Sequence, residues 1–190
     1  MRSIFLFCLC FAALTSFAQS YKLADGHKIS FTNPDVSGTF DELSATSIVF
    51  DETKLASAKL SFKIEVGSIN TGNGLMNKHA RGEEWFNADK YPYIEFTSTK
   101  IEKTNEGFKA TGKLQMHGVS KEVSIPFTFS KKGNKGTFIA KFSVDRSDYQ
   151  VGKKNGGVAK TIKIRLCLCL PSIILDTKIK ENPIAKLALI

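Results

Sequence analysis

Apolar and polar residues alternate along most of this chain with the period of a β-strand. The clearest run lies between 59 and 66, where every second residue is apolar: Leu60, Phe62, Ile64 and Val66. A second run, 137–144, repeats the pattern except at Ile139. Because successive side chains of a strand point to opposite faces, each run predicts a strand with one buried face and one solvated face.

Turn residues divide the alternating regions into about eight strands. These are expected at 21–31, 36–50, 58–69, 93–103, 108–116, 123–130, 137–146 and 160–170. The second strand is expected to bend at Asp41-Glu42, and Pro126 indicates a bulge or an edge in the sixth. No long amphipathic helix is available to cover a sheet of this size. The sequence therefore predicts an all-β protein, an eight-stranded antiparallel barrel.

One segment, 75–87, interrupts the alternation and is expected to form one or two short helical turns around Gly82. Long excursions within compact β domains are often functional. The interior of an eight-stranded barrel holds either side chains or one small ligand. Rigid phenylalanine rings do not easily fill a narrow cylinder, so an apolar tunnel is expected, and a barrel packed solid is the alternative.

The two ends of the chain are expected to lie outside the barrel domain, which is assigned to 19–171. Residues 1–18 have the order of a secretory signal peptide: Arg2, a short apolar run, and small residues before a cleavage site after Ala18. The protein is therefore expected to be periplasmic or secreted. Residues 172–190 form an atypical apolar and basic tail with no sustained period.

The chain is basic, with a formal net charge of +9. Such a surface could make transient contact with a membrane, or it could simply keep the protein soluble. The lysines form no stripe with interleaved aromatic residues, so no nucleic-acid partner is expected. Cys167 and Cys169 lie on one face of one strand, at a spacing unsuited to a disulfide and without a second pair of zinc ligands. The oligomeric state is expected to be a monomer or a homodimer.

Residues for catalysis are not apparent. The chain has no nucleophile elbow, no His-Glu-x-x-His and no phosphate-binding glycine loop before a helix. Its three histidines, His27, His79 and His117, lie far apart without ligand spacing. We therefore expect no catalytic residue, no metal and no enzymatic activity.

Three motifs occur in a fixed order. The first is His79-x-Arg81, followed by Trp85-Phe86 and Tyr91-Pro92; the second is Leu114-x-x-His117-Gly118-Val119-Ser120-Lys121; the third is Arg146-Ser147-Asp148-Tyr149. Over about 21–170 the chain resembles the YceI-like family of exported lipid-binding proteins, with Ser120 in place of Thr and Tyr149 in place of Phe. The resemblance implies a lipocalin-like barrel around an apolar tunnel, and no cofactor other than a bound lipid such as a polyisoprenoid or isoprenoid quinone. The tail after Leu170 departs from the family pattern.

Candidate tunnel residues follow from the resemblance and from the parity of the strands, with ordinary barrel core as the alternative for each. They are Phe62, Ile64, Phe96, Leu114, Met116, Phe127, Phe129, Phe138 and Phe142. Trp85 and Phe86 are expected to gate the mouth or to anchor the inserted turns.

Three further residues are candidates for a polar head group. His79 and Arg81 could contact it, or could pin the inserted turns. Arg146 is expected to pair with Asp145, Asp148 or a loop carboxylate, and a head-group role is the alternative. His117 is expected to stabilise its hairpin.

These observations predict a periplasmic carrier of a long-chain lipid, most directly a polyisoprenoid or an isoprenoid quinone. Two alternatives remain. One is a small redox-associated protein or enzyme that uses His79 and His117. The other is a stress-response envelope protein whose barrel has no ligand.

Overall fold

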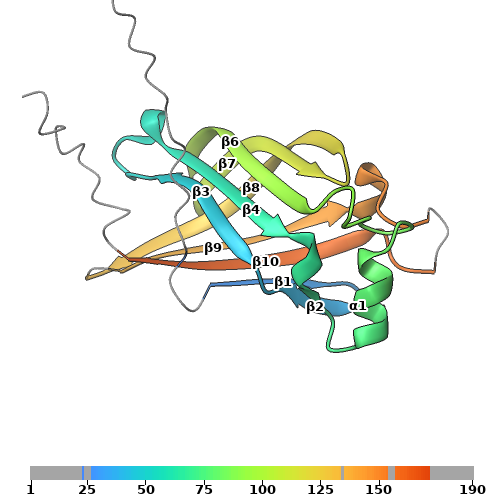
Figure 1. Ribbon diagram of the computed structural model, residues 1–190. Coiled ribbons are helices and arrows are strands. Elements are labelled where there is room, and N and C mark those ends of the chain that lie inside the picture. The colour runs from blue at the N-terminus through green and yellow to red at the C-terminus, as the bar shows by residue number, and fades with distance from the viewer. Residues whose placement is uncertain (1–22, 24–26, 134, 154–156, 172–190) are drawn as a thin grey trace, which may run out of the picture.

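The computed structural model describes residues 23, 27–133, 135–153 and 157–171 (Figure 1). Within them, ten strand segments form one antiparallel sheet: β1 (Lys28–Thr32), β2 (Ser37–Phe40), β3 (Leu43–Val49), β4 (Lys59–Glu65), β5 (Ile69–Asn70), β6 (Tyr93–Thr104), β7 (Gly107–Met116), β8 (Val119–Lys132), β9 (Lys135–Asp145) and β10 (Thr161–Pro171). The helical segments are α1 (Gly74–Arg81) and the 3₁₀-helices η1 (Leu55–Ser57), η2 (Val66–Ser68) and η3 (Arg146–Tyr149). The expected leader 1–18 and tail 172–190 lie outside the described residues.

Two of the strands are bent, and each of them carries two labels. Only Asp41 and Glu42 separate β2 from β3, and η2 separates β4 from β5. The bent strands stay paired along their length, β2 with β5 and β3 with β4. At the bend itself the Asp41 N–H donates to the Ser68 carbonyl at 3.2 Å. The bend expected at Asp41-Glu42 is therefore confirmed.

These bends allow the sheet to close into a barrel. β1 pairs with β2 on one side and with β10 on the other, and the ring continues through β9, β8, β7 and β6 to β4. Counting each bent strand once, the ten segments make the eight antiparallel strands that the alternation predicts. Figure 1 shows α1 beside β2 at one end of the barrel. Toward the other end, the outer edge of β3 pairs with no strand among the described residues.

The buried face of each strand follows the period of two. In β7 the alternate residues Phe108, Ala110 and Leu114 are buried, and in β9 Phe138 and Ala140 are buried. β8 pairs with β7 from Val119, but its pairing with β9 begins only at Phe127. Pro126 is the residue just before that second pairing, so it occupies a position with a partner on one side alone, as a proline requires.

Gly112 marks the tightest approach between two strands. It stands opposite Ser98, where the β6–β7 register shifts. A Cβ at Gly112 would collide with the Thr97 carbonyl and would lie 2.6 Å from the Ser98 Cα. A side chain at this position must therefore push two backbones apart.

Replacement of Gly112 by alanine is expected to lower the free energy of unfolding by about 1–3 kcal/mol, the usual cost of overpacking. Urea unfolding followed by circular dichroism measures it. Gly74→Ala is the matched control, because a Cβ there meets nothing within 4 Å. Gly74 is the first residue of α1, and alanine favours a helix over glycine by up to about 1 kcal/mol. Equal effects at the two positions would contradict this account.

Candidate functional site

A cavity of about 290 Å³ lies inside the barrel at the end nearest α1. Its walls come from seven of the eight barrel strands, with each bent strand counted once, and from α1 and the loops around it. These walls are apolar apart from Asp35, Thr71, His79 and Arg146. The apolar part includes Ile29, Phe31, Val36, Phe40, Ile69, Met76, Ala80, Ile94, Val144, Val151, Val158 and Ile162. A site of this composition suits a hydrocarbon ligand better than a polar substrate.

A second chamber of about 80 Å³ lies deeper in the barrel. All of its lining residues are apolar, and five of them also line the larger cavity: Ile29, Ile64, Ile94, Leu114 and Phe142. The two spaces therefore adjoin, with shared side chains between them. The barrel thus holds two neighbouring apolar spaces along its length, here called the apolar path.

A cluster of five phenylalanines fills the barrel beyond the deeper chamber. Phe50 follows β3 and contacts four rings from the far wall, with ring centroids 5.0–5.7 Å apart: Phe108, Phe127, Phe129 and Phe138. All four contacts are edge-on, within about 30° of perpendicular, and aromatic pairs favour such geometry. Phe127 and Phe138 also line the deeper chamber, so the phenylalanine cluster is its floor.

The inserted segment covers the opposite end of this path. The Asn73 side chain caps α1 by accepting from the N–H groups of Leu75 and Met76 at 3.0 and 3.1 Å. Met76, His79 and Ala80 then line the cavity. The first turn remains largely in solvent, with Leu75 64% and Met76 41% exposed. This helix is therefore held at its start by a cap and lies over the cavity without burying any residue fully.

Trp85 and Phe86 follow α1 and both line the cavity. The Phe86 ring contacts Phe40 edge-on, with centroids 6.0 Å apart. The Trp85 ring lies under the Arg146 guanidinium, whose Cζ is 5.3 Å from the ring centroid. Gly152 must be a glycine here, because its φ is +72° and a Cβ would lie 2.8 Å from the Trp85 ring. The two aromatic residues thus anchor the inserted segment and form part of the cavity wall.

Arg146 is 4% exposed and is held by backbone carbonyls. Its guanidinium donates to Val151 and Val158 at 2.7 Å, and to Lys153 and Ala159 at 3.2 and 3.3 Å. The expectation of a carboxylate partner for Arg146 is therefore wrong. The backbone carbonyls around this buried arginine accept from the N–H groups of its planar guanidinium. These hydrogen bonds satisfy the guanidinium without a second buried charge.

The two carboxylates expected beside Arg146 have other partners. Asp145 accepts from the Ser147 hydroxyl at 2.6 Å and from the Ser147 N–H at 2.8 Å, and these bonds lower the pKa of the carboxyl. Asp148 pairs with Lys121 at 2.6 Å. Asp145 thus caps η3, and Asp148 links η3 to β8.

The histidines and Arg81 occupy different places. His79 lines the cavity at its exposed end. The Arg81 guanidinium is outside it and donates to the Gly67 carbonyl at 3.2 Å. His117 has a φ of +51° in the β7–β8 turn, its Nδ1 is 3.2 Å from the Tyr149 carbonyl oxygen, and its ring lies 4.8 Å from that of Tyr91. These contacts of His117 suit the structural role expected for it.

Ten of the eleven candidate tunnel residues lie on the walls of the two chambers. Phe62, Phe96, Phe127 and Phe138 line the deeper one, Trp85, Phe86 and Met116 the larger one, and Ile64, Leu114 and Phe142 both. Phe129 lies in the phenylalanine cluster instead. Of the polar candidates, the structure brings His79 and Arg146 to the cavity and leaves Arg81 outside.

Several wall residues were not anticipated from the sequence. Ile29, Phe31 and Ile162 follow the same alternation as the candidate tunnel residues, so the period of two predicts an inward position for them as well. Val151 and Val158 come from loops, where no period marks the inward side. Within the described ranges, no three metal-binding side chains gather at one point. None of the helices in that part of the chain is long and apolar enough to cross a membrane.

Fold and cavity together define a lipocalin-like β-barrel with an apolar interior. Residues 21–169 match the YceI-like domain, and the chain belongs to that family. A UPF0312 protein of Yersinia enterocolitica is 28% identical over 135 residues, which cover 68% of this chain and 70% of the relative.

Solved structures show the same fold. BcnA of Burkholderia cenocepacia is 29% identical, with a TM-score of 0.71 over 75% of this chain and 95% of that protein. A polyisoprenoid binding domain from Saccharophagus degradans, implicated in plant cell wall breakdown, has a TM-score of 0.56 at 16% identity, over 78% of this chain and 98% of that one. At that identity the likeness concerns the fold alone.

Proposed function

We propose that this protein is a non-enzymatic periplasmic carrier for a long-chain isoprenoid lipid, held tail-first in the barrel. The observation that carries the proposal is the pair of adjoining apolar chambers, of about 290 and 80 Å³, covered by α1 at one end and floored by phenylalanines at the other. Burial of hydrocarbon contributes about 0.8 kcal/mol per CH₂. A branched, unsaturated tail therefore gains its affinity from the barrel walls. A Saccharophagus degradans protein that shares this fold is a polyisoprenoid binding domain, which makes this class of lipid the first to test.

The polar groups at the cavity favour a lipid with a neutral head group. Four of the N–H groups of Arg146 already donate to backbone carbonyls, and a guanidinium has only five. Arg81, the other candidate cation, faces away from the cavity. Asp35 contributes a carboxylate to the same wall, and its Oδ2 accepts from the Ala159 N–H at 2.6 Å. An isoprenoid quinone fits this setting better than a prenyl pyrophosphate.

The direct test is to identify what the purified protein carries. Organic extraction followed by mass spectrometry should release an isoprenoid lipid, and the emptied protein should take up ubiquinone from detergent solution. A clean extract together with no uptake of ubiquinone or of a polyprenyl phosphate would count against the carrier function. The control is the same protein expressed from residue 19 onward, without the expected leader, because it cannot acquire lipid in the periplasm.

Selectivity for the head group gives a separate prediction. With prenyl tails of equal length, a quinone is expected to bind at least about tenfold more tightly than a pyrophosphate, a difference of about 1.4 kcal/mol. The reason is that the pyrophosphate would lose water at the cavity, where the buried Arg146 guanidinium already donates to backbone carbonyls. Quenching of Trp85 fluorescence, the signal of the single tryptophan, reports both titrations. Tighter binding of the pyrophosphate would show that Arg146 exchanges its carbonyl partners for the ligand.

A further inference from the structure

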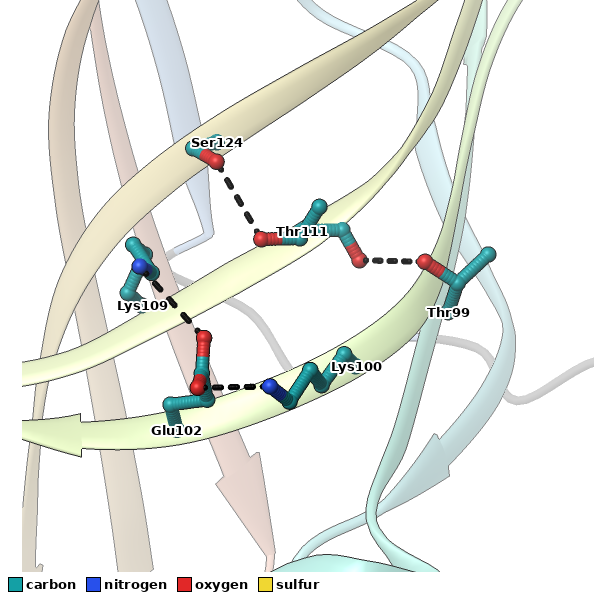
Figure 2. Close-up of polar contacts among 6 residues, drawn as sticks. All are labelled: Thr99, Lys100, Glu102, Lys109, Thr111 and Ser124. Atoms are coloured by element: carbon teal, nitrogen blue, oxygen red, sulfur yellow. Dashed lines mark hydrogen bonds and ion pairs between the residues drawn. The ribbon is translucent and has the colours of Figure 1, made fainter.

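Charges on one side of the barrel's outer surface are balanced between neighbouring strands. On β4, β6, β7 and β8, lysine stands opposite glutamate at three cross-strand positions: Lys63 with Glu95, Lys109 with Glu102, and Lys113 with Glu122. Figure 2 shows Glu102 between Lys109 and Lys100, at 3.4 and 2.7 Å, beside hydrogen bonds that join Thr99, Thr111 and Ser124. We call this side the paired wall.

The outer face of β9, β10 and β1 is different. Arg165 stands directly opposite Lys141 in the β9–β10 register, and Lys163 and Lys28 lie on the same face. All four side chains are exposed, and no described carboxylate pairs with any of them. Like charges directly opposite each other on a sheet destabilise it. These four residues, the basic wall, therefore oppose folding slightly, and an external anion would relieve the repulsion.

A shallow groove runs along the basic wall. The four cations line it together with serine and threonine hydroxyls, and its lining contains no carboxylate: the hydroxyls are those of Ser30, Thr32, Ser37, Thr39 and Ser143. Phosphate oxygens accept from ammonium and guanidinium groups, so the four cations are the donors for them; among the hydroxyls, that of Thr39 already donates to the Asp41 carboxylate at 2.7 Å. The groove thus has the chemistry of a surface for phosphate esters.

The groove also lies against the wall of the cavity. Phe31, Phe142 and Ile164 line both the groove and the larger cavity, because they belong to the same three strands as the basic wall. A phosphate-rich surface bound at the groove would therefore lie next to the end of the barrel that α1 covers.

We infer that the basic wall docks the barrel on the phosphate head groups of an anionic bilayer, beside the mouth through which lipid passes. The choice of a bilayer over an acidic protein rests on the proposed function, since an isoprenoid cargo has to leave one membrane and enter another. The groove extends across four strands, β1, β2, β9 and β10, so several head groups can be contacted at once. Each lysine or arginine near such a surface adds to the attraction, and salt weakens it.

The test is sedimentation of the protein with vesicles. Wild-type protein should bind phosphatidylcholine vesicles that contain about a third phosphatidylglycerol, and should bind pure phosphatidylcholine much less. Lys141→Gln with Arg165→Gln is expected to weaken binding about thirtyfold, from the two charges lost. The matched control, Lys109→Gln with Lys113→Gln, removes the same net charge from the paired wall and should keep most of the binding.

Stability and cargo uptake complete the experiment. Lys141→Gln with Arg165→Gln removes a like-charge pair, so it should unfold at the same or higher urea concentration than wild type. Its uptake of ubiquinone from detergent should be unchanged, which separates docking from cargo binding. Failure of ubiquinone uptake in both proteins would refute the carrier function and leave docking to the vesicle result. The inference would be overturned if wild-type protein bound both vesicle types equally, or if the two double variants lost equal amounts of binding. Absence of any vesicle binding would also overturn it, and would leave an acidic protein as the partner of the basic wall.

Discussion

An Arg146→Ala variant is expected to lose roughly 3–5 kcal/mol of unfolding free energy, because four hydrogen bonds from a buried charged group disappear together. The carbonyls of Val151 and Val158, both bonded at 2.7 Å, would be left without their donor, and the Trp85 ring would lose the cation above it. The loop after η3 should loosen with them. Urea unfolding by circular dichroism measures the loss.

Arg81→Ala is the control for this prediction, since it removes the same side chain from a solvent-exposed helix. Arg81 makes one hydrogen bond, at 3.2 Å to the Gly67 carbonyl. Its loss should change the unfolding free energy by less than about 1 kcal/mol. If Arg146→Ala cost no more than Arg81→Ala, the loop carbonyls would have found water in place of the guanidinium, and Arg146 would be free for another role.

Replacement of Leu114 by tryptophan is expected to weaken binding of a prenyl quinone by at least about tenfold. Leu114 is 6% exposed and lines both chambers, so a larger side chain there takes volume from both of them. The indole occupies the space of several methylene groups, each worth about 0.8 kcal/mol when buried. Phe62→Trp, in the deeper chamber, should act in the same direction, and Arg81→Ala should have a much smaller effect. Radiolabelled quinone uptake measures all three.

A matched variant separates a filled cavity from a damaged core. Ile101 on β6 is 5% exposed, nearly the same exposed fraction as that of Leu114, but it lines neither chamber. Ile101→Trp should therefore destabilise the barrel by overpacking, about 1–3 kcal/mol, and leave quinone affinity nearly unchanged. Equal losses of affinity in the two tryptophan variants would mean that barrel stability, and not cavity volume, controls binding. If Arg81→Ala abolished quinone binding while Leu114→Trp and Phe62→Trp left it unchanged, the ligand would instead be a small polar molecule at the mouth.

The alternation of side chains carries most of the information about this fold. It predicts β4 from Leu60 onward and the other long strands, because a barrel has one inside and each inward residue must be apolar. The bend at Asp41-Glu42 is also visible, as two adjacent acids that cannot sit on an inner face. η3 is less visible: it begins at Arg146, where the alternation of side chains predicts the end of a strand. A 3₁₀-helix of four residues is little more than one turn, so the segment is too short to show any period in the pattern.

The site is predictable to a smaller extent. Phe62 and Leu114 follow from parity, whereas Phe40 and Ile69 sit where the two bent strands pair and were missed. Arg146 was identified as a residue of interest, but its partners were not. Nearby carboxylates are visible in a sequence, whereas a carbonyl belongs to every residue. Only the placement of the described loop residues, 151–153 and 157–159, decides which carbonyls reach the guanidinium.

The phenylalanine cluster around Phe50 makes the barrel blind at one end. A ligand that enters tail-first can then leave only by reversing along the same path, head group first. Its dwell time should rise steeply with the length of tail inside, by about fourfold for each buried CH₂ if withdrawal exposes that group to water. A membrane at the mouth removes this penalty, since the tail passes from one hydrocarbon phase to another. With the same closed floor, the protein would thus release its lipid slowly in water and exchange it quickly with a bilayer.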